Sequence, residues 1–272
     1  MRSTPRSIPR SKKGDSPGWK FILPSLVLLG LIGLPILALA WKAANISIIP
    51  FAFTESAISA LKLSLVTSTV CVVVSILTGT PLAYIQAHWS FRGKAFLDVL
   101  VDLPIVLPPS VAGIALLMAF GREGLFGDWL NILGVSIPFT TVAVVMAQVF
   151  VSAPFLVRSA RIGFASIDPQ LDEAAKVEGA STWHVFQHIM LPLASRALMT
   201  GIILSWTRAL GEFGATLLFA GNLEGKTQTM PLAIYVGFEQ GLGIALVLSV
   251  VLLAVSFVLL VVLRRLELQN QH

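Results

Sequence analysis

Charge and cysteine are scarce in this sequence. Only 12% of the 272 residues are charged, about half the share of a typical soluble domain, while 56% are hydrophobic and the mean hydropathy is +0.85. The single cysteine, Cys71, cannot form a disulfide within the chain. These shortages exclude a soluble globular domain, a disordered chain and a disulfide-stabilised scaffold. The class that fits is a polytopic membrane protein.

Long apolar runs predict an all-α fold with six transmembrane helices, because a membrane-spanning helix needs about 20 apolar residues. The runs that reach or approach this length cover residues 21–41, 63–87, 103–120, 137–157, 197–220 and 244–263. The fifth run is interrupted only by Arg208 and Glu212. The third contains Pro104, Pro108 and Pro109, which predict a broken or kinked start and make these prolines candidates for a kink or gate.

The distribution of lysine and arginine predicts that both termini are cytoplasmic. With this orientation fourteen basic residues lie in or beside cytoplasmic segments and four in or beside outer ones, which is a strong positive-inside bias. The chain then comprises a basic cytoplasmic tail (1–20), a membrane domain (21–263) with a large cytoplasmic loop at about 158–196, and a cytoplasmic C-terminal tail (264–272). The net charge of +5 is therefore explained by basic residues that lie on the cytoplasmic side of a lipid bilayer, and it does not indicate binding to nucleic acid.

The large cytoplasmic loop is predicted to hold two short helices that meet at a glycine. Asp168 can cap the free N–H groups of a first helix, with Pro169 at its first position. Gly179 can adopt the left-handed conformation that ends a helix. Ser181 can cap a second helix, and Pro192 either stops that helix or opens the next span. Such a helical hairpin would project from the membrane.

One spacing within this loop is specific to a family. It consists of an acidic residue with two alanines, a glycine, and an apolar segment that ends in proline: Glu173, Ala174, Ala175, Gly179, Ile189, Leu191 and Pro192. This pattern resembles the "EAA" loop of permease subunits of binding-protein-dependent ABC importers. The resemblance implies that the loop binds the cytoplasmic ATPase subunit and transmits its opening and closing.

The same resemblance implies the rest of the assembly. Two permease chains, here a homodimer, would surround the path, with an ATPase subunit dimer below and an extracytoplasmic oxyanion-binding protein above. ATP hydrolysis would then belong to a separate subunit. The chain itself is expected to be no enzyme and to carry no cofactor.

Two further segments resemble the molybdate and sulfate permease group. They are residues 80–84 together with 103–113, and residues 208–222. Sulfate permeases usually carry tyrosine where Phe213 stands and serine where Ala215 and Thr216 stand, so the likeness is to the molybdate branch. The implied function is ATP-driven import of molybdate, with tungstate or sulfate as alternatives. An ion-coupled secondary transporter would need inverted repeats and carboxylates in its spans, and only Glu212 qualifies.

Arg208 and Glu212 are the charged residues of the fifth run. A spacing of four places both on one face of a continuous helix, within reach of an ion pair. Intramembrane charges are costly, so the two are expected to face protein or a water-filled path. Either Arg208 assists passage of a tetrahedral dianion while Glu212 holds the guanidinium, or the pair is structural and locks the span to its neighbours.

No catalytic or metal site is predicted. His184 and His188 lie four residues apart, but no third ligand is evident in the sequence. Residues 220–227 nearly spell a nucleotide-binding P-loop, yet they follow a membrane span and fall on the outer side in the predicted orientation. Serine, histidine and acidic residues form no recognisable nucleophilic constellation.

Overall fold

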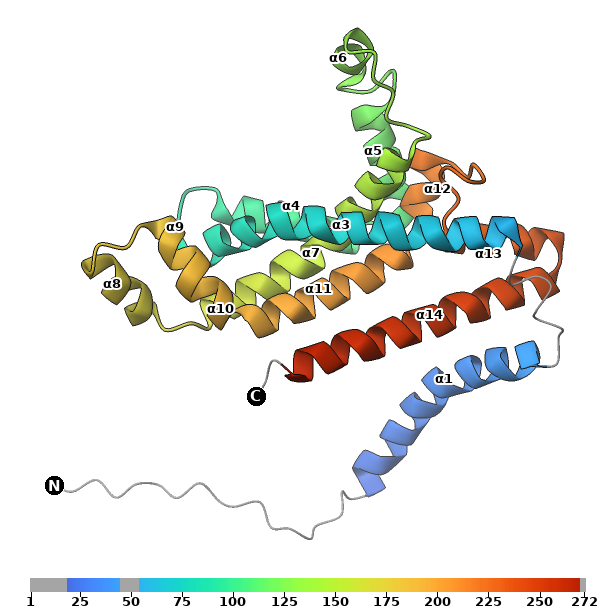
Figure 1. Ribbon diagram of the computed structural model, residues 1–272, viewed down its shortest axis with the longest axis horizontal. Coiled ribbons are helices and arrows are strands. Elements are labelled where there is room, and N and C mark those ends of the chain that lie inside the picture. Colours follow the sequence, from blue (N-terminus) through green and yellow to red (C-terminus); the bar gives the residue numbers. More distant parts are fainter. Residues whose placement is uncertain (1–18, 45–53, 270–272) are drawn as a thin grey trace. The chain divides into compact units, whose positions relative to one another are not determined.

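A computed structural model of the chain describes residues 19–44 and 54–269, and the regular secondary structure in these ranges is helical, without any strand (Figure 1). The chain divides into two compact units, residues 1–47 and 48–272. Most of the predicted basic tail, up to residue 18, and residues 270–272 of the C-terminal tail lie outside the described residues. In the first unit, helix α1 (Trp19–Ala44) covers the predicted first span and is long enough to cross a membrane.

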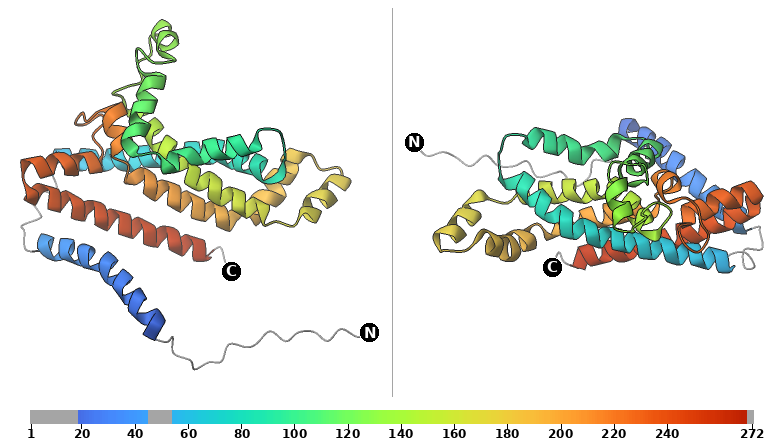
Figure 2. Two further views of the ribbon diagram at one scale, coloured as in Figure 1. Left: turned by 180° about the vertical axis from the view of Figure 1, so that it is seen from behind. Right: turned by 90° about the horizontal axis from the view of Figure 1, so that it is seen from above.

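Three long helices form the centre of the second unit: α3 (Glu55–His88), α7 (Thr141–Ala165) and α11 (Ser195–Leu210). They lie side by side in all views (Figures 1 and 2). Small residues permit this close approach. A Cβ atom at Gly201 of α11 would lie 3.1 Å from the backbone of Leu156 in α7.

The bounds of α3 and α7 differ from those of the predicted apolar runs, and capping side chains define where the two helices start. Thr54 and Thr140 accept hydrogen bonds from Ala57 N and Ala143 N, at 3.3 and 3.2 Å. Helix α3 thus begins eight residues before the predicted boundary at 63. Helix α7 ends eight residues after the predicted boundary at 157. Hydropathy locates the lipid-facing part of a helix and not its full length.

The predicted third span is not one helix. It is formed by α4 (Lys94–Val106) and α5 (Pro109–Phe120), which are bent by 120° at the intervening residues. Pro109 has no N–H to continue the α4 hydrogen bonds, and a residue before proline avoids the helical region. Leu107 and Pro108 accordingly adopt ψ angles of 134° and 136°. The predicted break is confirmed at Pro108 and Pro109, whereas Pro104 lies inside α4 without interrupting it.

The predicted fifth span, residues 197–220, is also wrong as one continuous helix. Helix α11 ends at Leu210, and a separate helix α12 (Gly214–Ala220) follows after three residues. The short α6 (Gly127–Ile132) follows α5, and the two extend away from the α3, α7 and α11 bundle (Figure 1). Helix α13 (Met230–Gln240), which no apolar run predicted, precedes α14 (Leu242–Gln269).

The number of membrane spans depends on how bent helices are counted. Four of the described helices are long and apolar enough to cross a membrane alone, namely α1, α3, α7 and α14. The number rises to six if each of two bent pairs is one span. The first pair is α4 with α5, and the second joins residues 182–193 to α11 through a bend of 76°. Six spans are thus consistent with the fold, although the fifth is built from other residues than predicted.

Candidate functional site

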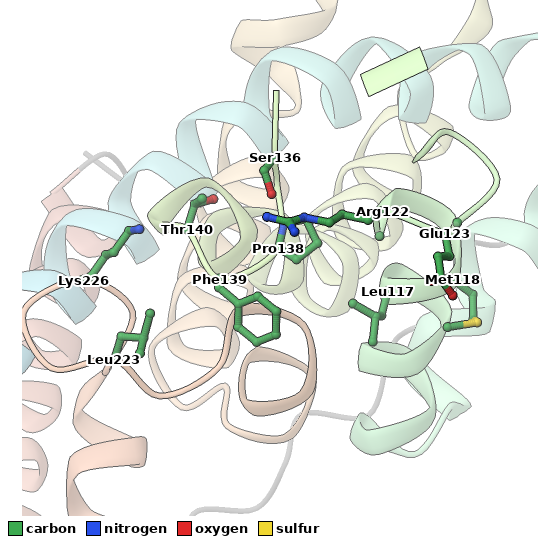
Figure 3. Close-up of a pocket in the computed structure, with 12 residues that line it drawn as sticks. Leu117, Met118, Arg122, Glu123, Ser136, Pro138, Phe139, Thr140, Leu223 and Lys226 are labelled. Carbon is green, nitrogen blue, oxygen red and sulfur yellow. The ribbon is translucent and has the colours of Figure 1, made fainter. Parts of the chain in front are cut away.

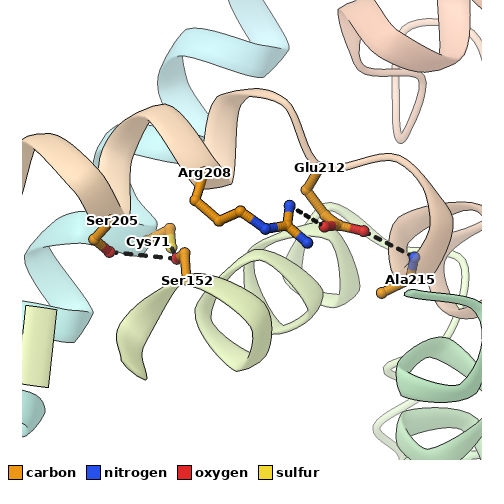
Figure 4. Close-up of polar contacts among 6 residues, drawn as sticks. All are labelled: Cys71, Ser152, Ser205, Arg208, Glu212 and Ala215. Carbon is orange, nitrogen blue, oxygen red and sulfur yellow. Dashed lines mark hydrogen bonds and ion pairs between the residues drawn. The ribbon is translucent and has the colours of Figure 1, made fainter. Parts of the chain in front are cut away.

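Arg208 and Glu212 form a short ion pair at the break between α11 and α12 (Figure 4). Arg208 Nη1 lies 2.6 Å from Glu212 Oε2, and the second carboxylate oxygen, Oε1, accepts a hydrogen bond of 2.9 Å from Ala215 N. The Glu212 side chain is 1% exposed and that of Arg208 is 32% exposed. Glu212 is therefore fully engaged within the protein, whereas Arg208 keeps part of its guanidinium accessible.

The predicted contact between Arg208 and Glu212 is confirmed, but its predicted geometry is wrong. The two residues do not share a helix, because α11 has already ended when the chain reaches Glu212. Glu212 acts instead as a capping carboxylate for the first turn of α12, where an anion is favourable. The carboxylate thus stabilises both the helix break and the arginine.

The two helix breaks meet in space. A Cβ atom at Gly214, which opens α12, would lie 2.7 Å from the Cβ of Pro109, which opens α5. A Cβ at Gly113 of α5 would likewise lie 2.9 Å from the carbonyl oxygen of Ala215. Any larger residue at Gly113 or Gly214 would push the two short helices apart. The candidate gate prolines Pro108 and Pro109 are thereby placed directly beside the segment that holds the ion pair.

A second polar cluster, which the sequence did not predict, joins the three central helices. Cys71 Sγ of α3 lies 3.2 Å from Ser152 Oγ of α7, and Ser205 Oγ of α11 donates to that same oxygen at 3.4 Å. All three residues are fully buried, one turn of α11 away from Arg208 (Figure 4). Small hydroxyls in apolar runs carry no periodic signal, so only the packing identifies them. These buried contacts join the three central helices.

The predicted helical hairpin of the loop is confirmed. Asp168 accepts a hydrogen bond of 3.0 Å from Gln170 N at the start of α8 (Pro169–Val177). Gly179 has a φ angle of +87°, which reverses the chain, and Ser181 then caps α9 (Thr182–Val185) through His184 N at 3.2 Å. Local capping chemistry therefore determines this part of the fold.

The hairpin has a packed side and a free side. Ala175, Ile189 and Leu191 pack against a buried cluster that includes Tyr84 and Phe164 of the long helices. Glu173, Ala174, Gly179 and Pro192 are exposed. Val177 and Trp183, both apolar, are 86% and 60% exposed. The loop thus rests on the bundle through the buried cluster, with the ring of Trp183 packed on Phe186 at the edge of that contact, and it exposes Val177 and acidic groups of α8.

Pro192 ends the hairpin differently from either predicted role. The chain continues from α9 through the π-helix η1 (Phe186–Met190) and α10 (Leu191–Leu193), and it bends into α11 at Ala194. A proline at position 192 cannot donate a hydrogen bond to His188, and the preceding turn widens so that Leu191 N donates to Phe186 O. The proline lies two residues before the bend.

Charged groups brace the hairpin and the same end of the bundle. Lys176 Nζ donates to Asp172 Oδ2 at 2.7 Å, and this hydrogen bond raises the pKa of Lys176 above its ordinary value. Asp98 of α4 accepts a hydrogen bond of 2.9 Å from Gln86 of α3. The same carboxylate forms an ion pair of 3.2 Å with Arg161 of α7. The ends of α3 and α7 and the start of α4 are therefore held together next to the hairpin.

The histidine pair and the P-loop-like segment have structural explanations. The rings of His184 and His188 stack with centroids 4.1 Å apart, and the described residues contain no group of three metal-ligating side chains. In the P-loop-like segment, the N–H groups of Lys226, Thr227 and Gln228 all point to the carbonyl of Leu223. They are consequently unavailable to cradle a phosphate.

The chain is similar to known proteins in sequence and in fold. Residues 79–269 match the family described as binding-protein-dependent transport system inner membrane component. The chain is 44% identical over 200 residues to a putative molybdenum transport system permease protein, YvgM, of Bacillus subtilis, covering 73% of this chain and 88% of that one. It is 39% identical over 242 residues to the molybdenum transport system permease protein ModB of Mycobacterium tuberculosis, covering 89% and 91%.

A sulfate relative and a solved structure are also similar. The sulfate transport system permease protein CysT of Escherichia coli is 34% identical over 249 residues, covering 90% of this chain and 88% of that one. The fold resembles that of a bacterial ABC transporter involved in import of the polysaccharide alginate, with a TM-score of 0.74, 17% identity and coverage of 92% and 94%. The family match spans well over half of the chain, and the relatives match it along most of its length. This chain therefore belongs to the binding-protein-dependent transport system inner membrane components, as a multi-pass permease subunit of an ABC importer.

Proposed function

We propose that this permease imports molybdate. The observation that carries the proposal is a like-for-like comparison, because ModB and CysT are matched over almost the same extent, at 39% and 34% identity. The segment around the ion pair supports the same branch, since it has Phe213, Ala215 and Thr216 where sulfate permeases usually differ. Phe213 packs on Tyr235 of α13, while Ala215 and Thr216 are fully buried. Tungstate, as another tetrahedral dianion, would follow the same path.

Deleting this subunit should separate the two oxyanions. In molybdate-starved cells, we expect loss of high-affinity molybdate uptake with sulfate uptake unchanged. An importer discriminates between two oxyanions by the difference in their free energies of binding and transport, and this difference is a property of the whole importer. Uptake of labelled molybdate and labelled sulfate by the same cells measures both. Complementation by the intact chain is the control. Collapse of sulfate uptake with retained molybdate uptake would assign the chain to the sulfate branch.

The exposed face of the hairpin supports an interaction with a cytoplasmic ATPase dimer. Val177 and Trp183 expose apolar area that a partner would bury, and Glu173 and Glu178 are exposed as well. Gly179 forms the turn at the tip of the hairpin, whereas Ile189 and Leu191 pack toward the bundle and Pro192 lies near the bend into α11. In this proposal the chain works as a homodimer, receives substrate from an extracytoplasmic oxyanion-binding protein, hydrolyses no ATP itself and carries no cofactor.

The orientation of the chain can be tested with thiol labelling, since the single native cysteine is fully buried. Val177→Cys places a thiol on the hairpin, and Ser136→Cys places one near the opposite end of α7, where the helix begins. We expect a membrane-impermeant maleimide to label intact cells at position 136 only, and permeabilised cells at both positions. The unsubstituted chain gives the background. Labelling of position 177 in intact cells would reverse the proposed orientation.

A further inference from the structure

Figure 3 shows a cavity of about 660 Å³ beside the residues that lead into α7. Its walls come from the end of α5, the segment that leads into α7, and the turn between α12 and α13. The hairpin follows the other end of α7. In the proposed orientation the cavity therefore faces the outside, where substrate arrives.

Two cations line this cavity from distant parts of the sequence. Arg122 follows α5 and Lys226 belongs to the turn before α13, and both are exposed. In Figure 3 the Arg122 side chain extends toward Ser136, and Lys226 lies on the side of Thr140. Within residues 19–44 and 54–269, neither cation is joined to a carboxylate by an ion pair. Their charge is thus available to a ligand.

The backbone holds the lysine in place. Thr141 Oγ1 donates to the carbonyl oxygen of Lys226 at 2.9 Å, which ties the turn to the start of α7. The hydrogen bonds that converge on Leu223 O keep this turn compact. The position of Lys226 in the cavity is therefore a property of the fold.

The remaining lining determines the kind of ligand. Leu117, Pro138, Phe139 and Leu223 form apolar walls, which strengthen the field of nearby charges. Glu123 is an opposing anion, but in Figure 3 it lies beside Met118, away from Lys226. Pockets of about 300–1,000 Å³ hold drug-sized ligands. A tetrahedral oxyanion would occupy this one with part of its hydration shell, which suits weak and transient binding.

We propose that this cavity is an outer acceptor site for the tetrahedral oxyanion, in which Arg122 and Lys226 hold the anion between its release from the binding protein and its entry into the membrane path. The inference rests on the proposed function, because it takes the substrate to be such an oxyanion. In this proposal Lys226 binds the anion through its side chain, although the backbone N–H groups of Lys226 and Thr227 in the P-loop-like segment 220–227 are unavailable to a phosphate.

The test uses the complete transporter in lipid bilayers, with the variant Arg122→Gln/Lys226→Gln. At saturating substrate-loaded binding protein, we expect molybdate uptake to fall about tenfold, since two charges near a partly desolvated anion are lost. The affinity of the binding protein for the transporter should be unchanged. Lys62→Gln removes an exposed charge of α3 outside the cavity and is the matched control, with uptake as in the unsubstituted chain.

Other occupants give different results. Weaker docking of the binding protein, with normal uptake at saturation, would make the cavity a protein-docking surface and overturn the proposal. A defect that appears only in bilayers containing anionic lipid would assign the two cations to a lipid headgroup and would overturn it as well. If the unsubstituted transporter carries neither molybdate nor sulfate, the proposed function has failed independently of the cavity.

A second measurement avoids dependence on the double variant. In the transporter with Ser136→Cys, millimolar molybdate should slow maleimide labelling of position 136, because the anion and the reagent compete for the same cavity. Labelling at Val177→Cys should not respond. Equal labelling rates at position 136 with and without molybdate and sulfate would contradict an oxyanion site.

Discussion

Removing either charge of the Arg208–Glu212 pair will sharply lower the yield of assembled transporter. Arg208→Met leaves a carboxylate that is 1% exposed without its counter-ion, and losing one partner of a buried pair commonly costs about 3–5 kcal/mol. Glu212→Ala removes the counter-ion and also the cap of Ala215 N, which adds about 0.5–2 kcal/mol. Both single variants therefore fail for structural reasons, whatever Arg208 does in transport.

The double variant Arg208→Met/Glu212→Gln separates structure from transport. Glutamine keeps an oxygen acceptor for Ala215 N, so the break before α12 is retained while both charges are removed. We expect the yield of detergent-extracted complex to recover to near that of the unsubstituted chain. ATP-driven uptake of molybdate, measured on the same preparations, then reports on Arg208 alone.

Both outcomes for uptake are informative. The full engagement of Glu212 with Arg208 and Ala215 favours a structural pair, which predicts that uptake by the double variant exceeds that of either single variant. Recovery of assembly with uptake no better than that of Arg208→Met would instead make the partly exposed guanidinium a required anion contact. The charge-retaining control is Arg208→Lys, which preserves the cation without the planar hydrogen-bonding fork.

Transport should also collapse when Gly179 is replaced by valine. Gly179 has a φ angle of +87°, a conformation that costs ordinary side chains about 1–2 kcal/mol and β-branched ones more. A cost of about 1.4 kcal/mol shifts the equilibrium between the native and the disrupted hairpin tenfold. We therefore expect molybdate uptake to fall at least about tenfold. Membrane insertion should be unaffected, since the hairpin lies outside the predicted spans. Uptake and the amount of protein in the membrane are measured together.

The cause of that loss can be isolated with asparagine. A Cβ atom at position 179 meets nothing within 4 Å, so a side chain has space and only the backbone conformation opposes it. Asparagine tolerates the left-handed region better than other residues, and Gly179→Asn should keep most of the uptake. Full uptake by Gly179→Val at normal expression would remove the hairpin from the coupling mechanism.

Local chemistry alone predicted the parts of this protein that depend on a few neighbouring residues. Scarce charge and long apolar runs specify a helical membrane protein, because unpaired backbone groups are too costly in lipid for irregular chains. The hairpin followed from Asp168, Gly179 and Ser181, whose capping and turn preferences act over three or four residues. The break at Pro108 and Pro109 followed from the missing N–H of proline.

Only the tertiary structure decided where the helices turn at Gly211–Phe213 and what those turns bring together. A bent pair of helices is as apolar as a straight one, so hydropathy could not reveal that 197–220 is two helices or that Glu212 caps the second. Nor could it bring Gly214 against Pro109, or Arg122 and Lys226 into one cavity. The hydropathy of a segment indicates whether its helix lies in lipid or in water. These contacts depend instead on how separate helices pack, which is a property of the whole fold.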